Sequence, residues 1–590
     1  MPFLFSRFCL IALVPVLAVP AARAADGAPE PGAAGTATSI APSTNQPEAS
    51  ADPLFSHGCL ALPPEGADPE TLAAFETRGL PVGDIQIVVD PIFDTSKPEE
   101  DNWLFRLVND WHIPTDTDVI RDDLLFASGE PFRVTRMAES ERVLRTRRYL
   151  RGADIRPVGE CLEKVDLEVR VKDVWTLVPD VGFSRSGGDN SSRLGFKDSN
   201  FLGTGRAVQV VREQDAERTG TMFGYRDPNF GNTRSVLDLE YTDNDDGQSH
   251  AFELFRPFFS LETPWAGGVL THRNLRTDTL NFRDEEIQSF EHEEESHGIF
   301  GGWSRGLIND ETERWRFGIS DERSQFRPNE DTVAEQPFPA DRHYRYGWLE
   351  WQRVHDSFVK AVNINQMRRT EDINTGWTTV LRFGRADDAL GSTDEAWFYQ
   401  LAAERYYLVG DDKVMFLSGA LNGRHDSEQV IDQRSELRLR YYQGDFSSHQ
   451  FYASLQLQQG RNLFVDEPIT LGGDNGLRGY PTRYQMGDRM ALLTLEERFY
   501  LFTEVLSLFD VGAAVFADVG RAWFDGKDNG YNGGWLRDVG FGLRLTPTRT
   551  GNERPGKQTV LHLDLAAPLN TDADPELDKL QWLVTIKDSF

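Results

Sequence analysis

Apolar and polar residues alternate one by one along most of the chain from Trp175 onward. In residues 436–441, for example, three charged side chains alternate with Leu437, Leu439 and Tyr441, and the pattern recurs in residues 451–458, 539–545 and 559–565. Because successive side chains of a strand point to opposite faces, the pattern predicts strands with one apolar and one charged face. A soluble sheet rarely continues for so long, so we expect a transmembrane antiparallel β-barrel over residues 174–590.

The last predicted strand shows the same alternation and ends on an aromatic residue. Its apolar face carries Trp582, Val584, Ile586 and Phe590. A closing strand of this kind resembles the C-terminal signal by which outer-membrane proteins are recognised for insertion. We therefore expect these four side chains to face lipid.

The N-terminal sequence predicts export. Arg7 precedes an apolar run over residues 8–22, and the small-x-small pattern around Ala24 predicts a signal peptide over residues 1–24. The alternative is an anchoring helix, but the run is too short and proline-broken to cross about 30 Å of hydrocarbon. Residues 25–79 contain little to bury in a core, and we expect a disordered tether there.

Residues 80–173 predict a small α+β domain. Strands are expected at 84–90, 153–158 and 165–171, and helices at 118–126, capped by Thr117, and at 134–148. This order resembles a polypeptide-transport-associated (POTRA) domain, although a generic α+β domain gives the same pattern. The resemblance implies a periplasmic unit whose exposed sheet edge binds an extended client chain by strand augmentation.

Charge composition and cysteine content limit the possible partners and the possible covalent links of the chain. With 94 acidic and 62 basic residues, the chain is too acidic to favour nucleic acid as a partner. Removal of the signal peptide leaves Cys59 and Cys161. Two cysteines in an exported chain predict one disulfide that pins the preceding segment to the α+β domain, with two free thiols as the alternative.

One arginine lies in a glycine-rich segment, LGGDNGLRGY, over residues 471–480. A guanidinium is suited to forked hydrogen bonding with a carboxylate. Asp518, in the sequence FADVG, points inward by alternation, and so does Glu496, with neighbouring Glu497 as its rival. Arg478 is therefore predicted to fasten a long loop to the barrel wall, while an exposed hairpin with an incidental arginine is the alternative.

Together these motifs resemble the outer-membrane protein assembly superfamily, which includes BamA- and TamA-like surface antigens and two-partner secretion transporters. The resemblance implies that Arg478, Gly479 and Tyr480 form the core of a loop folded into the lumen, and that Asp518 and Glu496 are its acidic partners. It also implies sixteen strands. The alternating segments number nearer twenty, so we assign the surplus between residues 282 and 385 to extracellular hairpins and expect sixteen.

Three functions remain open. The first is a factor that assists insertion or translocation of proteins at the bacterial outer membrane, the second is a two-partner secretion transporter, and the third is a porin-like channel. We expect unfolded client proteins, outer-membrane lipid and lipopolysaccharide as partners, and a monomeric barrel. We expect no enzyme activity, cofactor or metal, and we interpret the acidic run EHEEESH at 291–297 as a solvated loop.

Overall fold

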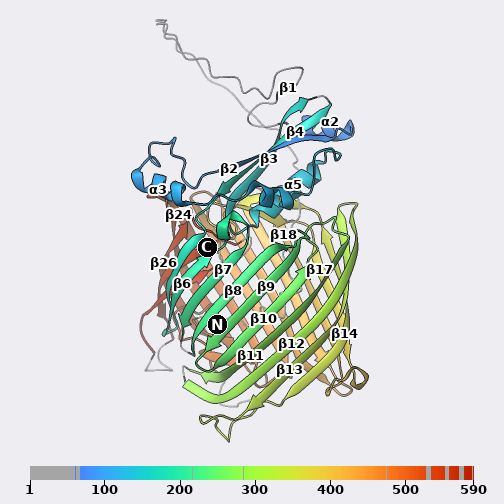
Figure 1. The fold of residues 1–590 in the computed structure, drawn as a ribbon. Coiled ribbons are helices and arrows are strands. Elements are labelled where there is room, and N and C mark those ends of the chain that lie inside the picture. The colour runs from blue at the N-terminus through green and yellow to red at the C-terminus, as the bar shows by residue number, and fades with distance from the viewer. Residues whose placement is uncertain are drawn as a thin grey trace.

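A computed structural model describes residues 60–61, 67–161, 163–215, 217–283, 285–473, 475–526, 533–551, 557–570, 577–587 and 589–590. A small α+β unit lies against one rim of a large barrel (Figure 1). We call this rim the N-terminal rim and the opposite one the far rim. The predicted signal peptide and most of the predicted tether lie outside the described residues.

The barrel is closed and antiparallel, and twenty strands of the described chain form its wall. They are β5 (Leu177–Ser186), β6 (Asp189–Asp198), β7 (Ala207–Gln214), β8 (Thr219–Phe230), β9 (Ser235–Asn244), β10 (Gly247–Arg256), β11 (Trp265–Phe282), β12 (Glu285–Ile308), β13 (Glu311–Arg327), β14 (Arg342–His355), β17 (Thr378–Ala386), β18 (Ala396–Leu408), β19 (Lys413–His425), β20 (Val430–Gly444), β21 (His449–Arg461), β24 (Arg489–Val505), β25 (Phe509–Trp523), β26 (Leu536–Pro547), β27 (Val560–Pro568) and β28 (Gln581–Lys587).

The expected sixteen strands are therefore wrong. In the range 282–385, where we expected surplus extracellular hairpins, β12, β13 and β14 are hydrogen-bonded into the wall, and β14 pairs directly with β17. The count of alternating segments in the sequence, nearer twenty, predicts the number of strands better than the sixteen implied by the resemblance. The EHEEESH run is likewise part of β12 rather than a loop.

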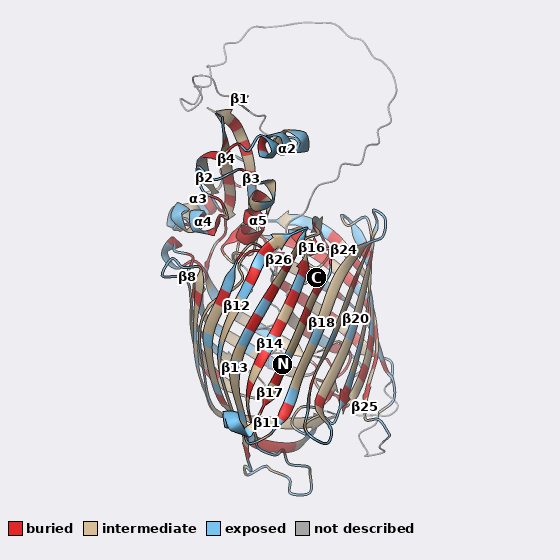
Figure 2. Cartoon of the chain, turned by 90° about the vertical axis from the view of Figure 1, so that its right-hand side faces the viewer, coloured by how far each residue is buried: buried red, intermediate tan, exposed pale blue. Residues whose placement is uncertain are grey.

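The two faces of the wall differ as the alternation predicts. Large apolar side chains are exposed on the outside, among them Phe196, Ile299, Phe317, Phe383 and Phe541. Buried charged side chains line the inside, among them Glu496, Arg498, Asp518, Arg544 and Asp564. Bands of buried and exposed residues follow each other along the strands in Figure 2. An apolar outer belt around a polar interior is characteristic of transmembrane barrels.

Two hairpins belong to neither the wall nor the N-terminal unit. One, residues 358–374, joins β15 (Phe358–Val362) to β16 (Thr370–Asn374) between β14 and β17 at the N-terminal rim, and we call it the strap. The other lies in the loop between β21 and β24 and joins β22 (Ile469–Leu471) to β23 (Gln485–Gly487). Short 3-10 turns occur at Phe201–Gly203 and Asp388–Leu390.

The N-terminal unit contains a sheet in the order β1-β3-β4-β2, with β2 parallel to β4. Its strands are β1 (Leu60–Ala61), β2 (Val82–Asp90), β3 (Leu150–Cys161) and β4 (Lys164–Asp173), and its helices are α2 (Pro69–Thr77), α3 (Trp103–Trp111), α4 (Thr117–Asp123) and α5 (Val134–Arg145). None of the described helices is long and apolar enough to cross a membrane.

Several local predictions for this unit need correction. Helix α2 lies inside the stretch expected to be a tether, is capped by Asp68, and buries Phe75 in the core of the unit. Helix α3 was not predicted. Asp116, not Thr117, caps α4, because its carboxylate accepts a hydrogen bond from the Asp118 N–H.

Candidate functional site

The loop between β21 and β24 folds into the barrel, and its arginine is almost completely buried. Arg478 donates from Nε and Nη2 to the two carboxylate oxygens of Asp518, at 2.8 and 3.0 Å. Its Nη1 donates to Glu496 Oε1 at 2.8 Å. The guanidinium carbon lies 3.3 Å from the ring centre of Phe516. The arginine is thus held on one face by an aromatic ring and around its edge by two carboxylates.

The acidic partners come from neighbouring wall strands. Glu496 lies on β24 and Asp518 on β25, and both side chains are buried. Glu496 also accepts a hydrogen bond from Arg498 Nε at 2.9 Å. Glu496 and Asp518 therefore face the guanidiniums of Arg478 and Arg498, and the charges of these four groups offset one another. Glu496 rather than Glu497 is the residue that reaches Arg478.

The two residues after Arg478 fit closely against the next strand, β26. The Gly479 N–H donates to Asp538 Oδ2 at 3.0 Å, and a Cβ on Gly479 would lie 2.7 Å from the Asp538 Cβ. Only glycine fits this approach. The buried Tyr480 hydroxyl donates to the Arg537 carbonyl oxygen at 3.0 Å. We call Arg478, Gly479 and Tyr480 with Glu496, Asp518 and Asp538 the latch.

The same loop also reaches the turn between β5 and β6. The Thr482 N–H donates to the Gly187 carbonyl oxygen at 3.3 Å, and the Thr482 hydroxyl bonds Asp189. A Cβ on Gly187 would lie 2.1 Å from the Thr482 nitrogen. The loop therefore contacts β26 on one side and the β5–β6 turn on the other. These elements flank the place where the barrel closes.

Of all neighbouring strands in the described wall, β28 and β5, which close the barrel, share the fewest paired residues. Strand β28 pairs with β27 from Val560↔Lys587 to Ala566↔Gln581, but with β5 only at Val584↔Arg185. Trp582 stacks on Phe183 and lies under the Arg185 guanidinium on the outer side. We call this junction the seam.

The end of the chain does not follow the lipid-facing pattern predicted for it. Trp582 and Ile586 are 46% and 42% exposed on the outer face, whereas Phe590 is 4% exposed. The Phe590 ring packs inside against Tyr500, Met367 and Ala514. The prediction for Phe590 was wrong because the alternation was extended past Lys587, where β28 ends.

The strap holds this inward-turned end. The Phe590 N–H donates to the Asn365 carbonyl oxygen at 2.9 Å. The strap tip also bonds the β26–β27 turn, since the Met367 N–H donates to Gln558 Oε1 at 2.6 Å, and it reaches β24, since the Tyr500 hydroxyl donates to the Asn363 carbonyl oxygen at 3.1 Å. The strap thus crosses the N-terminal opening of the barrel.

The base of the strap is bound to the N-terminal unit. Arg145 of α5 donates two hydrogen bonds to Asp372, at 2.8 and 3.0 Å, and Lys360 Nζ lies 2.7 Å from Glu141 of the same helix. Helix α5 is therefore connected to Phe590 through one inserted hairpin. The strap lies in the range 282–385 in which hairpins outside the wall were expected, and its insertion across the N-terminal opening was not predicted.

The positions of the cysteines, of the EHEEESH run and of Asp538 complete the comparison with the sequence predictions. Cys59 lies outside the described residues; Leu60 and Glu160, which adjoin Cys59 and Cys161 in sequence, are Cα partners between β1 and β3. In the EHEEESH run, His292 bonds Asp278 and Glu293 bonds Arg273. Asp538 was not predicted, although its alternation with Val539 resembles that of Asp518.

No protein-family model matches the chain. No curated protein matches it either. Among solved structures, it is similar to BamA from Haemophilus ducreyi lacking POTRA domains 1-3, at 12% identity over 86% of this chain and 84% of that one, with a TM-score of 0.37. It is similar to CdiB from Escherichia coli at 13% identity, over 86% and 76% of the chains, with a TM-score of 0.44.

A second CdiB, from Acinetobacter baumannii, is 11% identical over 86% of this chain and 73% of that one, with a TM-score of 0.42. The described wall is a closed antiparallel barrel with an apolar outer belt, which is the architecture of outer-membrane proteins. The chain is also similar to OccK5 (OpdH) from Pseudomonas aeruginosa, at 9% identity over 68% of this chain and 93% of that one, with a TM-score of 0.28.

Proposed function

We propose that this protein assists the insertion of client proteins into the bacterial outer membrane, with its N-terminal unit in the periplasm. The observation that carries the proposal is the seam. It has one Cα pair, Val584↔Arg185, whereas the adjoining β27–β28 ladder runs along the whole of β28. A barrel normally removes its sheet edges by closure. A barely paired edge can open to admit a client strand at low cost.

The N-terminal unit supports the same role. Strand β2 lies at the end of its sheet, where it pairs with β4. The end strand of a sheet offers backbone groups to an extended chain, which binds by adding a strand. A client bound to β2 would lie at the N-terminal rim, from which it can approach β5 and β28.

The contents of the lumen favour the seam over a central route. The latch loop buries Leu477, Tyr480 and Tyr484 within the barrel, and the strap crosses the N-terminal opening. A secretion transporter would have to displace both inserts to pass a polypeptide, and a porin-like channel would have to conduct around them. The role proposed here needs no covalent chemistry.

The test is to lock the seam with a disulfide. Cysteines are introduced at Arg185 and Val584, which are Cα partners. The matched control places cysteines at Tyr225 and Leu239, Cα partners in the fully formed β8–β9 ladder. Both variants retain Cys59 and Cys161. Assembly of a radiolabelled outer-membrane client is measured in reconstituted vesicles before and after reduction.

We expect the locked seam to stop client assembly, reduction to restore it, and the control lock to have no effect. Undiminished assembly with the seam locked would reject the proposal. If vesicle conductance or export of a secreted polypeptide persists through a locked seam, the transporter or the channel becomes the better interpretation.

A further inference from the structure

We propose that α3 is a membrane-interface helix and that the pocket beside it holds an acyl chain of a phospholipid from the periplasmic leaflet. The inference adds a lipid site to the proposed function and depends on its orientation of the barrel, with the N-terminal rim at the periplasmic surface. In Figure 1 this helix projects to the side of the N-terminal rim instead of covering the sheet.

Helix α3 presents an apolar face that nothing in the described chain covers. Trp103 is 75% exposed, Leu104 46% and Trp111 73%. With 3.6 residues per turn, these positions share one side of the helix with Leu107. Arg106 and Asp110 lie at the polar border of that side. Large exposed tryptophans at the rim of a membrane protein are typical of the membrane–water interface.

The helix is held firmly with that face turned outward. Its opposite side buries Phe105, whose ring stacks on Phe93 with centres 3.9 Å apart. Asn109 donates to the Phe93 carbonyl oxygen and accepts from the Phe93 N–H, at 2.8 and 3.1 Å. The exposure of the tryptophans is therefore a property of a fixed helix and not of a loose segment.

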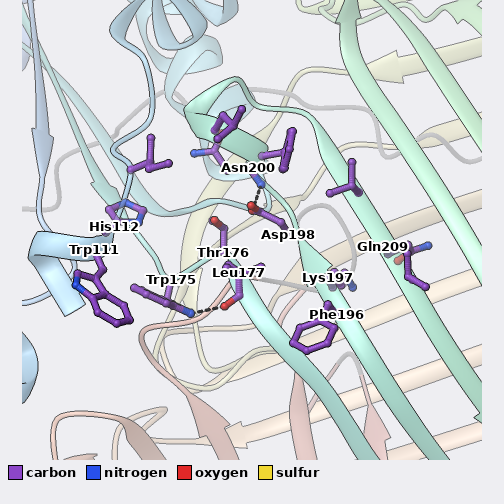
Figure 3. Close-up of a pocket in the computed structure, with 15 residues that line it drawn as sticks. Trp111, His112, Trp175, Thr176, Leu177, Phe196, Lys197, Asp198, Asn200 and Gln209 are labelled. Carbon is purple, nitrogen blue, oxygen red and sulfur yellow. Dashed lines mark hydrogen bonds between the residues drawn. The ribbon is translucent and has the colours of Figure 1, made fainter. Parts of the chain in front are cut away.

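A pocket of about 310 Å³ connects the helix to the outer wall of the barrel. Trp111 and Ile113 line one side, and Leu177, Phe196 and Val210 of β5, β6 and β7 line the other. Figure 3 shows Trp111 and Trp175 on the helix side and Phe196 on the wall side. Lys197 also borders the pocket.

Continuity with the lipid-facing wall identifies the occupant. Phe196 is 67% exposed, Leu177 52% and Val210 48%, and all belong to the outer belt of the barrel. An acyl chain lying on that belt can extend into the pocket without leaving an apolar environment. The pocket also adjoins the start of β5, whereas the one pair of β5 with β28 is at Arg185 near its other end. The lipid would therefore lie on the outer belt at the N-terminal rim, at the opposite end of β5 from the seam pair.

Photoactivatable phosphatidylethanolamine tests this site. The full chain is reconstituted in phosphatidylethanolamine–phosphatidylglycerol vesicles that contain the probe, and labelled peptides are mapped by mass spectrometry. Three proteins are compared: wild type, Trp103→Gln with Trp111→Gln, and the control Arg106→Gln with Asp110→Asn. Labelling of β17 around Phe383, which is exposed on the outer belt and does not line the pocket, verifies insertion of each protein into the vesicle.

We expect labelling of residues 103–113 in wild type and in the control, and its loss in the tryptophan variant while β17 remains labelled. Wild-type α3 without label, or equal α3 labelling in the tryptophan variant, would overturn the site. A photo-crosslinker at Leu104 that captures a protein instead of lipid in native membranes would also overturn it. None of these readouts involves client assembly, so the result is independent of the seam experiment.

Discussion

The N–H of Phe590, the last residue of the chain, donates to the carbonyl oxygen of Asn365 at the tip of the strap, 2.9 Å away. The strand that closes the barrel is therefore held from inside by an insert between β14 and β17, while its ladder to β5 is almost absent. This relationship makes the C-terminal aromatic a structural part of the lumen.

Replacement of Phe590 by alanine should destabilise the barrel by about 3 to 5 kcal/mol, the usual cost of removing a buried phenylalanine. The ring packs with Tyr500 and Met367 inside the lumen. The control is Ile586→Ala on the exposed outer face of the same strand, where less packing is lost. Urea titration of vesicle-inserted protein gives both free energies of unfolding. Equal losses would contradict the inward placement of Phe590.

Arg478→Ala should remove the common partner of two buried carboxylates and cost about 3 to 5 kcal/mol. Arg478→Lys should rescue poorly because an ammonium group lacks the forked geometry that spans Asp518 and Glu496. An exposed control is Arg489→Ala, whose pair with Asp525 should contribute about 1 kcal/mol or less. A double-mutant cycle with Asp518→Ala should be strongly non-additive. Strictly additive losses of stability would show that Arg478 and Asp518 do not interact.

Neighbouring residues on β21 test the two faces of the wall. Leu455→Arg places a charge on the lipid face and should cost about 2 to 4 kcal/mol near the midplane. Gln456→Arg points inward, where Gln456 donates to Glu436 at 3.3 Å, and should be tolerated. The fraction of protein with heat-modifiable gel migration measures assembly. His562, which alternates with Leu561 and Leu563 on β27, would be an unsuitable inward site because it is buried and is the Cα partner of Arg544.

The contact between α5 and the barrel should depend on pH. Burial raises the pKa of Glu139 from 4.5 to about 7, against the opposing effects of Arg142 and the Leu261 N–H. A carboxyl with a raised folded-state pKa holds its proton while the unfolded chain has lost it, so stability falls as pH rises from about 4.5 to about 7 and is level above that window.

Protease protection of α5, compared at about pH 5 and about pH 8, should therefore be greater at the lower pH. Glu139→Gln should abolish the difference, because the amide does not titrate in this range. A difference that survives in this variant would assign the pH dependence to another group, such as Asp356, whose pKa burial raises to about 6.

The predicted disulfide remains to be tested chemically. A bridge between Cys59 and Cys161 would close a loop of about a hundred residues and stabilise the N-terminal unit by a few kcal/mol. Peptide mapping of protein purified without reductant should show the two cysteines linked. Recovery of both as free thiols would dismiss the bridge.

Alternation and charge chemistry predict the barrel, the inward Asp518 and the partnership of Arg478 with acids, because these depend on local sequence. The strap and the strand number depend on which strands pair. Residues 358–374 form a paired hairpin, as two wall strands would, and the direct pairing of β14 with β17 excludes them from the wall. The prediction for Phe590 failed because alternation assigns a side chain to a face of the wall only within a strand, and Phe590 lies beyond the end of β28.

The partners of Arg478 lie close to it along the chain: Glu496 is 18 residues away and Asp518 is 40. The seam, in contrast, joins the first wall strand to the last. Contacts between nearby residues are closed at a lower entropic cost than contacts between distant ones. The C-terminal strands and their loop can therefore fold as one unit before they pair with the first wall strands. Closure of the barrel is then the final step of its own assembly, and its near-absent ladder leaves that step easy to reverse.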